Sequence, residues 1–378
     1  MIYILIDMSD IKNTVKESVL PLPKTIWHKL AGKRKAITAQ EYTPDEQSWD
    51  NLLLDQGGTP HYMQSSAWGE SKAHSQWPVS RLVVHLNDRV LPIQVFSRTV
   101  PGLGRLHYAP EVSGITKASI PAVTTQILSQ YNKGMVFKLE LYQPYDDDLI
   151  EAFQKNGWLR ANSVQHRDTV IVDLSGSEED LFARLKKRAR YEVRVAQRNN
   201  VRVEKVEINQ DRLNLLAELM GITAKRSGAF FRKDTYTNKY WHAFARRNQG
   251  SLYFAWHDMD LLAGAYVASY GKNAWYKDGG SVRHKSNLMG PRYLQWEIMR
   301  DLQSQAVKQY DLSGIPATED VEKSSMKGLY VFKTGFSNES VKLMPAMELP
   351  LSKRHQLWPK AEQHFLRLYS GFRKDFWY

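Results

Sequence analysis

The same order of structural elements occurs twice along this chain, and this repetition constrains the fold more than any other feature. In the first copy, alternating and apolar runs predict strands and a helix at residues 81–86, 91–96, 106–108, 120–131 (the helix) and 136–141. The order returns about 170 residues later, at residues 252–256, 261–267, 274–276, 293–303 (the helix) and 309–312. A repeat this long is typical of two related α/β domains rather than of a solenoid.

The charge balance favours anionic partners. The 378 residues include 52 Lys and Arg against 40 Asp and Glu, a net charge of +12. Such a surplus suits nucleic acid, phosphorylated metabolites or acidic lipid surfaces, although solubility alone is an alternative explanation. The chain has no cysteine, which excludes disulfides, thiolate nucleophiles and Cys-based zinc sites.

Residues 1–35 form a basic leader that we expect to be irregular, because Pro21 and Pro23 interrupt any helix. Order is expected to begin with a strand at residues 36–39, followed by a helix capped by Thr43. The apolar start of the leader is shorter than the roughly 20 residues that span a bilayer. No signal peptide or membrane span is predicted, so we expect a cytoplasmic protein. We also expect it to be a monomer.

One predicted helix is strongly basic. It begins at the cap Ser177 and runs to about Arg198, with Leu181, Leu185 and Ala189 forming a buried stripe. Its three- and four-residue spacing places cations on one face, namely Arg184, Lys187, Arg188, Arg194 and Arg198. Like charges this dense repel one another unless a polyanion neutralises them, so we interpret the face as a nucleic-acid or phosphate contact; a solvated surface is the alternative.

The common catalytic signatures are missing: there is no P-loop, no dinucleotide glycine fingerprint and no metal-binding histidine motif, and no metal site is predicted. Residues 281–290 lie between a strand and a helix, where acetyltransferases of the GNAT type hold the coenzyme A pyrophosphate. Such a site needs close-approaching glycines and free backbone N–H groups, but only Gly290 is present and Pro291 removes a donor. The segment therefore resembles an acyltransferase site that has lost its coenzyme.

Six segments, in order, resemble the FemABX family, the aminoacyl-tRNA-dependent peptidyltransferases of bacterial cell-wall synthesis. They cover most of residues 40–350 and comprise QSSAWGESK at 64–72, TVIVDL at 169–174, the basic stretch 188–203, YKDGGS at 276–281, YDLSG at 310–314 and GLYVFKTGF at 328–336. The last is the most specific. Read without the family, residues 331–336 are only a strand-like apolar run that contains a lysine.

The resemblance implies two tandem GNAT-like (acyl-CoA N-acyltransferase-like) α/β domains with mixed sheets flanked by helices. Residues 36–166 together with 342–378 would form the first domain, and residues 167–341 the second. Residues 207–250 are too few for the long coiled-coil arm of some relatives. No cofactor is implied: the co-substrate would be aminoacyl-tRNA, without coenzyme A, and the acceptor a lipid-linked or UDP-linked peptidoglycan precursor.

Site residues also follow from the resemblance. Lys333 would stabilise the oxyanion of the transition state, and Phe332 would shape the pocket for the terminal adenosine of the tRNA, with core packing as the alternative. The acceptor site would contain Lys72 and Arg232 on the diphosphate, together with Trp68, Tyr108, Tyr236 and Tyr276. No general base is evident, and the family implies that substrate groups assist instead.

Two departures from the family affect the choice of substrate. Tyr108-Ala109-Pro110-Glu111 stands where the family often has Arg-Gly-Pro or Arg-Asp-Pro, and Ser337-Asn338 replaces a common Gly-Gly. The C-terminal helix is basic and aromatic, which suits peripheral contact with an anionic membrane, although a docked structural helix is equally consistent. Two other functions stay open: an N-acyltransferase acting on another amine, such as an exopolysaccharide or a metabolite, and a non-catalytic RNA-binding protein.

Overall fold

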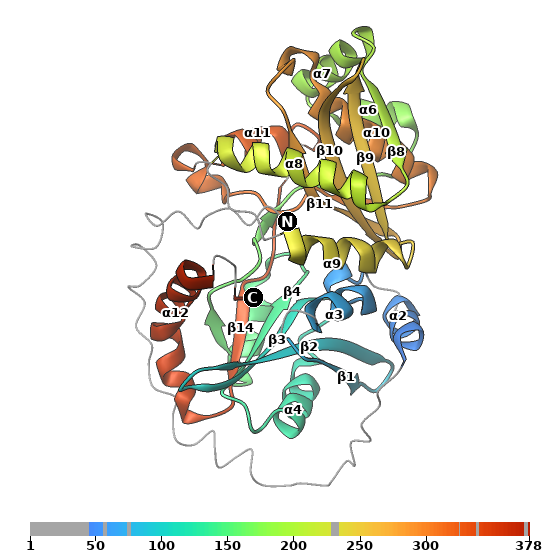
Figure 1. The fold of residues 1–378 in the computed structure, drawn as a ribbon. Coiled ribbons are helices and arrows are strands. Elements are labelled where there is room, and N and C mark those ends of the chain that lie inside the picture. Colours follow the sequence, from blue (N-terminus) through green and yellow to red (C-terminus); the bar gives the residue numbers. More distant parts are fainter. Residues whose placement is uncertain are drawn as a thin grey trace.

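The computed structural model describes residues 45–55, 59–73, 77–227, 234–324, 326–337, 340–373 and 377–378. These residues form two α/β domains, each built on a six-stranded sheet (Figure 1). The first sheet has the order β1 (Val79–His85), β2 (Val90–Val100), β3 (Gly104–Val112), β4 (Val136–Leu141), β14 (Ala346–Pro350) and β5 (Leu159–Ala161). The second has the order β8 (Arg202–Val206), β9 (Gly250–His257), β10 (Asp260–Tyr270), β11 (Asn273–Ser281), β12 (Gln309–Asp311) and β7 (Ile171–Asp173).

The predicted duplication is confirmed by the strand pairing. In both domains three consecutive strands pair antiparallel and a fourth pairs parallel with the third, as β1 to β4 and as β9 to β12. A parallel pair needs a crossover connection. Helix α4 (Ile120–Gln130) supplies it in the first domain and α10 (Gly290–Ser304) in the second. This arrangement is that of two tandem GNAT-like domains.

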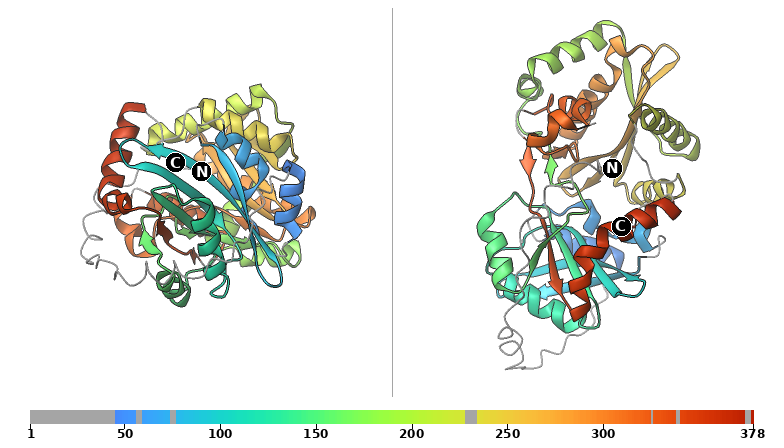
Figure 2. Two further views of the ribbon diagram at one scale, coloured as in Figure 1. Left: turned by 90° about the horizontal axis from the view of Figure 1, so that it is seen from below. Right: turned by 90° about the vertical axis from the view of Figure 1, so that its left-hand side faces the viewer.

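The chain crosses between the domains twice, and the two crossings lie side by side. β6 (Asp168–Thr169) pairs antiparallel with β13 (Val341–Lys342) to form a two-stranded link, which the right-hand view of Figure 2 shows between the domains. Beyond the link, β14 inserts between β4 and β5 of the first sheet. The domain boundaries expected from the sequence, at residues 166–167 and 341–342, lie at this link.

Each domain has a core of its own, and a third core joins them. Helices α4 and α5 (Asp147–Lys155) cover one face of the first sheet, and α10 and α7 (Lys187–Arg198) cover one face of the second. The joint core contains Trp68 and Tyr62 from the first domain and Trp241 and Trp275 from the second. Helix α3 (Ser66–Ala73) therefore packs close to α9 (Asp234–Ala245), as Figure 1 also shows.

No long helical arm projects from the described part of the second domain. The longest described helix, α8 (Gln210–Ser227), has 18 residues and packs on β11. Helix α12 (Trp358–Arg373) lies against the first domain (Figure 1). The expected strand at residues 36–39 and the helix cap Thr43 lie outside the described residues, and α2 (Glu46–Asp55) begins at Glu46.

Two local predictions were wrong. The single basic helix is two helices, α6 (Glu178–Arg184) and α7, because the Lys186 N–H donates to the Gly335 carbonyl at 3.0 Å instead of continuing α6. The cap at Ser177 is confirmed and forms a capping box with Asp180, and the buried stripe of Leu181, Leu185 and Ala189 is confirmed as well. Residues 331–336 are not a strand: α11 (Lys327–Lys333) ends at Lys333 and a turn follows.

Candidate functional site

Lys333 is a buried cation held only by backbone oxygens among its described contacts. Its Nζ donates to the carbonyls of Ser313 at 3.0 Å and Gly314 at 2.8 Å, and the residue is 3% exposed. Burial lowers the pKa of Lys333 to about 7, against which the charge of Asp311 acts. Because carbonyls neutralise an ammonium poorly, this Nζ can gain from an anionic oxygen placed beside it.

Asp311 connects the Lys333 region to the first domain. It lies at the end of β12 and accepts hydrogen bonds from the Ser313 N–H at 2.7 Å, the Tyr142 hydroxyl at 2.8 Å and the Thr169 hydroxyl. Tyr142 follows β4 in the first domain, so its bond to Asp311 crosses the junction. Burial raises the pKa of Asp311, and the hydrogen bonds that it accepts oppose this shift. The junction thus fixes the loop whose carbonyls hold Lys333.

Arg292 holds the segment on the other side of Lys333. Its guanidinium packs against the rings of Phe332 and Phe336, with Cζ 4.6 and 4.5 Å from the ring centroids, and donates to the Phe332 carbonyl at 2.6 Å. Its Nε donates to Glu192 of α7 at 2.8 Å. Sequence reasoning missed this residue. The available signal was an arginine on the buried face of α10, where an unpaired charge is costly.

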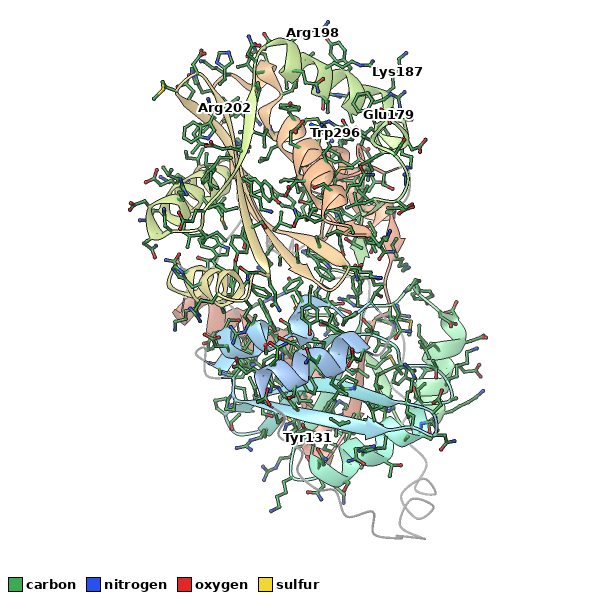
Figure 3. All side chains as sticks on the ribbon, turned by 90° about the vertical axis from the view of Figure 1, so that its right-hand side faces the viewer. Tyr131, Glu179, Lys187, Arg198, Arg202 and Trp296 are labelled. Atoms are coloured by element: carbon green, nitrogen blue, oxygen red, sulfur yellow. The ribbon has the colours of Figure 1, made fainter. Side chains whose placement is uncertain are left out.

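The cations of α7 form an exposed surface that starts beside this segment. Lys187, Arg188, Arg194 and Arg198 are exposed around Tyr191, which is 60% exposed. Figure 3 shows Lys187 and Arg198, together with Arg202 of β8, at the end of the second domain that faces away from the first. Arg184 does not share this face, because it belongs to α6 and its guanidinium donates to Asp173 and Ser175.

Two buried lysines flank Trp68 where the domains meet. The Nζ of Lys72, in α3, lies 5.5 Å from the Trp68 ring centroid, and that of Lys277, in β11, lies 5.8 Å from it. Lys277 also lies 4.0 Å over the Tyr240 ring and 3.6 Å from the Asp278 carboxylate. The structure therefore brings Trp68 and Lys72, both predicted, together with Lys277, which sequence reasoning missed.

A bulge in β11 places Lys277 there. Tyr276 pairs with Val267 and Asp278 with Tyr266, so the register between β10 and β11 skips Lys277. Bulges re-aim side chains and are common next to functional sites. Tyr276 instead packs against the second-domain core, and its carbonyl accepts from the Ser313 hydroxyl at 2.9 Å, on the Lys333 side.

The remaining residues predicted for the acceptor site are Tyr108, Arg232 and Tyr236. Tyr108 is buried in the first domain, donates to Glu140 and accepts from the Gln165 amide at 3.2 Å. Arg232 lies outside the described residues, as does the side chain of Tyr236, although Tyr236 itself belongs to α9. Within the described ranges, no group of three or more His, Asp or Glu could hold a metal ion.

The segment where GNAT-type acetyltransferases hold coenzyme A carries an ion pair in this chain. Lys285 of the loop between β11 and α10 forms an ion pair with Asp260 at 2.5 Å and contacts His257 at 3.1 Å. Lys285 and Met289 have left-handed backbones, with φ of 55° and 57°.

No helix in the described part of the chain is both long and apolar enough to cross a bilayer.

Comparisons with known proteins find one family and several relatives. The model of the FemAB family matches residues 151–261 and 255–358. The lipid II:glycine glycyltransferase of Staphylococcus haemolyticus (strain JCSC1435) is 21% identical over 352 residues, covering 72% of this chain and 83% of that protein. The crystal structure of FemX superimposes with a TM-score of 0.76 at 17% identity, covering 86% of this chain and 99% of that one. The C-terminal domain of a putative lysylphosphatidylglycerol synthetase from Agrobacterium fabrum has a TM-score of 0.51 at 11% identity, covering 85% and 96%.

Proposed function

The chain belongs to the FemAB family, and we propose that it moves an amino acid from aminoacyl-tRNA to the stem-peptide amine of a peptidoglycan precursor. The observation that carries this proposal is the position of Lys333: a buried ammonium at the domain junction, directly joined through Gly335 to a helix with an exposed cationic face. The related lipid II:glycine glycyltransferase supports a precursor of this class as the acceptor.

At the chemical step, the acceptor amine attacks the ester carbonyl of the charged tRNA. Negative charge develops on the carbonyl oxygen, and the Lys333 ammonium stabilises it more in the transition state than in the ground state. The carbonyls of Ser313 and Gly314 fix the position of Nζ beforehand. Because burial lowers the pKa of Lys333 to about 7, the charge of this side chain near neutral pH depends on what lies beside it. The negative oxyanion that develops there favours the protonated, charged form of Lys333.

The donor tRNA would lie along α7. Lys187, Arg188, Arg194 and Arg198 offer an exposed cationic surface to its phosphates. The terminal adenosine would approach Phe332, whose ring is held by Arg292. A coenzyme A ester is a less suitable donor, because Lys285 in the corresponding loop is already paired with Asp260.

The acceptor would bind through its diphosphate between the domains. Lys72 and Lys277 come from different domains and share the Trp68 ring, so an anion between them would be held by charge-assisted bonds. Such bonds position the acceptor without touching its reacting amine. Arg232, which lies outside the described residues, would add a third cation according to the family pattern.

A lipid-linked acceptor would bring the protein to the cytoplasmic membrane surface, and α12 supports such contact. Leu357, in the turn just before α12, and Leu368, within α12, are 57% and 64% exposed, and Lys360 and Arg367 are exposed near them in the sequence. Apolar side chains among cations suit an anionic bilayer. Sedimentation with phosphatidylglycerol vesicles tests this: Leu357→Ser with Leu368→Ser should reduce binding, whereas Met259→Ser, 90% exposed in the second domain, should not.

The biological role is tested by mass spectrometry of muropeptides from a strain that lacks this protein. We expect stem peptides that have lost one or more bridge residues, and restoration by the wild type but not by Lys333→Ala. Unchanged muropeptides would favour the alternatives: acylation of another amine, which purified protein would perform with acyl-coenzyme A, or RNA binding without transfer.

A further inference from the structure

Tyr191 is a large aromatic side chain that α7 leaves in solvent. It is 60% exposed, so most of its ring is open to a partner. The apolar face of the same helix, which contains Ala189, Val193 and Ala196, is buried in the core of the second domain. The packing of α7 therefore does not depend on Tyr191, and an exposed aromatic ring in a strongly charged surface calls for another explanation.

Two arginines lie on either side of this ring along the helix. Arg188 and Arg194 are three residues before and after Tyr191, a spacing that makes side chains neighbours on a helix surface. Arg188 donates from Nε to Glu192 at 2.9 Å, yet its side chain is 79% exposed. Arg194 is exposed as well, with Cζ 5.2 Å from the Phe182 ring centroid. These contacts hold both guanidinium groups in place beside Tyr191 and leave them open to solvent.

Unpaired RNA fits this surface better than duplex RNA or a bilayer. In a duplex the base faces are stacked on one another, so its phosphates would meet the cations while the ring had no base to contact. A bilayer surface binds helices that bring several large apolar side chains to one exposed face. Tyr191 is the one exposed large hydrophobic among residues 187–198, all of which the structure describes. Only an unpaired strand uses both the cations and the ring.

The contacts of α7 indicate which part of a tRNA this strand is. The Lys186 N–H, at the N-terminal cap of α7, donates to the Gly335 carbonyl, and Arg292 bonds both α7 and the Phe332 carbonyl. Tyr191 lies five residues beyond this cap, which is about 7.5 Å of helix rise. The terminal adenosine is proposed at Phe332, and the nucleotides that precede it in a tRNA are the unpaired 3′ end. A strand that leaves Phe332 along α7 is therefore unpaired.

We propose that Tyr191 stacks on an unpaired base of the tRNA 3′ end, with Arg188 and Arg194 on the neighbouring phosphates. This inference rests on the proposed function, which supplies the tRNA as donor. Every base has a π-face, so the stack tolerates any base and sets the path of the strand rather than the choice of amino acid. Because the stack is the same before and during the reaction, it should lower the KM for charged tRNA without raising kcat.

The test compares wild type, Tyr191→Ala and Tyr191→Phe as full-length proteins. The probe is unfractionated, uncharged tRNA, either intact or trimmed at its 3′ end to the last base pair. With intact tRNA, Tyr191→Ala should weaken binding by about 5- to 150-fold, the range for the loss of one base–aromatic stack, and Tyr191→Phe should restore it. The slope of log affinity against log salt should not change, because no phosphate contact is lost. With trimmed tRNA all three proteins should bind equally.

The opposite results would overturn the inference. They are an unchanged affinity of Tyr191→Ala for intact tRNA, an equal loss with trimmed tRNA, or a shallower salt slope, which would indicate lost phosphate contacts. If Tyr191→Ala lost binding to phosphatidylglycerol vesicles and kept its affinity for tRNA, the surface would be a membrane contact instead. The matched control is Leu54→Ala, which removes a 40% exposed apolar side chain from α2 of the first domain and should bind tRNA as the wild type does.

Transfer is measured separately, with charged tRNA and UDP-linked muramyl pentapeptide, so that the two proposals can fail independently. Tyr191→Ala should raise the KM for charged tRNA by about the factor lost in binding, with kcat close to that of the wild type. A fall in kcat at unchanged KM would contradict the role of Tyr191 in binding the donor. If the wild type binds tRNA but transfers no amino acid, the proposed function fails, and the binding comparison still decides whether Tyr191 stacks on the 3′ end.

Discussion

The backbone N–H of Lys186 donates to the carbonyl of Gly335 at 3.0 Å, which joins the N-terminal cap of α7 to the turn that follows Lys333. The same two segments are joined again by Arg292, which bonds Glu192 of α7 and the Phe332 carbonyl. A tRNA bound along α7, as we propose, would therefore act on a helix in direct contact with the segment that contains Lys333. This relationship makes the Gly335 turn a sensitive point for transfer.

Gly335→Ala should damage both stability and transfer. A Cβ at this position would lie 2.5 Å from Nη1 and 3.0 Å from Cζ of Arg292, which is buried and bonded on two sides. We expect a loss of about 1–3 kcal/mol in the free energy of unfolding and a fall of at least about tenfold in kcat. Urea unfolding and steady-state transfer measure the two effects. The matched control is Gly328→Ala, in α11 with nothing within 4 Å; equal behaviour of the two variants would contradict the argument.

Charge reversal on α7 should weaken tRNA binding in a salt-dependent way. Lys187→Glu and Arg198→Glu each remove one exposed cation, so the slope of log affinity against log salt should decrease by roughly 0.7–0.9 per phosphate contact. Filter binding across a salt series measures this slope. Lys133→Glu makes the same charge change on the exposed turn after α4 of the first domain and should leave the slope unchanged. If all three variants lose affinity equally, net charge rather than α7 is responsible.

Lys277→Met should raise the KM for the precursor and leave kcat nearly unchanged. A charge-assisted hydrogen bond contributes about 1.5–3 kcal/mol, which corresponds to a rise of roughly 10- to 150-fold. Lys272→Met, on the exposed turn between β10 and β11, is the control. With an acceptor peptide that lacks the diphosphate, the wild type and Lys277→Met should have the same KM. A variant with lower kcat and unchanged KM would assign Lys277 to the chemical step instead.

Lys333 should destabilise the folded protein below neutral pH. Its pKa falls from 10.5 in the unfolded chain to about 7 in the folded one. Between these values the unfolded state binds more protons, so this residue makes stability rise with pH through that window. Above pH 10.5 the contribution vanishes, and below pH 7 the penalty is complete.

The comparison is with Lys333→Met, which has no titrating group. The difference in unfolding free energy, wild type minus variant, should become more negative as pH falls from about 10 to 7 and then level off. Its full range should be a few kcal/mol, since each pKa unit corresponds to about 1.4 kcal/mol. A difference that does not depend on pH would show that Lys333 is not desolvated in the folded state.

The tandem architecture could be predicted because its determinants are local. Strand alternation and the amphipathic faces of α4 and α10 lie within single segments, and their repeated order indicates the duplication without any long-range information. The buried stripe of α6 and α7 is predictable for the same reason. The break between these helices is not: Leu185 and Lys186 carry no stop signal, and the break results from a bond to Gly335, about 150 residues away in the chain.

The site was predictable only where a motif marks it. Lys333 and Lys72 lie in segments that resemble the family, whereas Lys277 has its position because of a bulge and because of rings at Trp68 and Tyr240 that come from distant segments.

We propose that this chain joins an amino acid from tRNA to a precursor amine at Lys333. The most direct measurement incubates purified protein with a mixture of charged tRNAs and either UDP-linked or lipid-linked precursor, and determines the mass of the precursor. We predict an increase equal to one or more aminoacyl residues, dependent on charged tRNA and lost in Lys333→Met, which should still bind tRNA. An unchanged precursor mass with every charged tRNA, or an equal gain with Lys333→Met, would contradict the account.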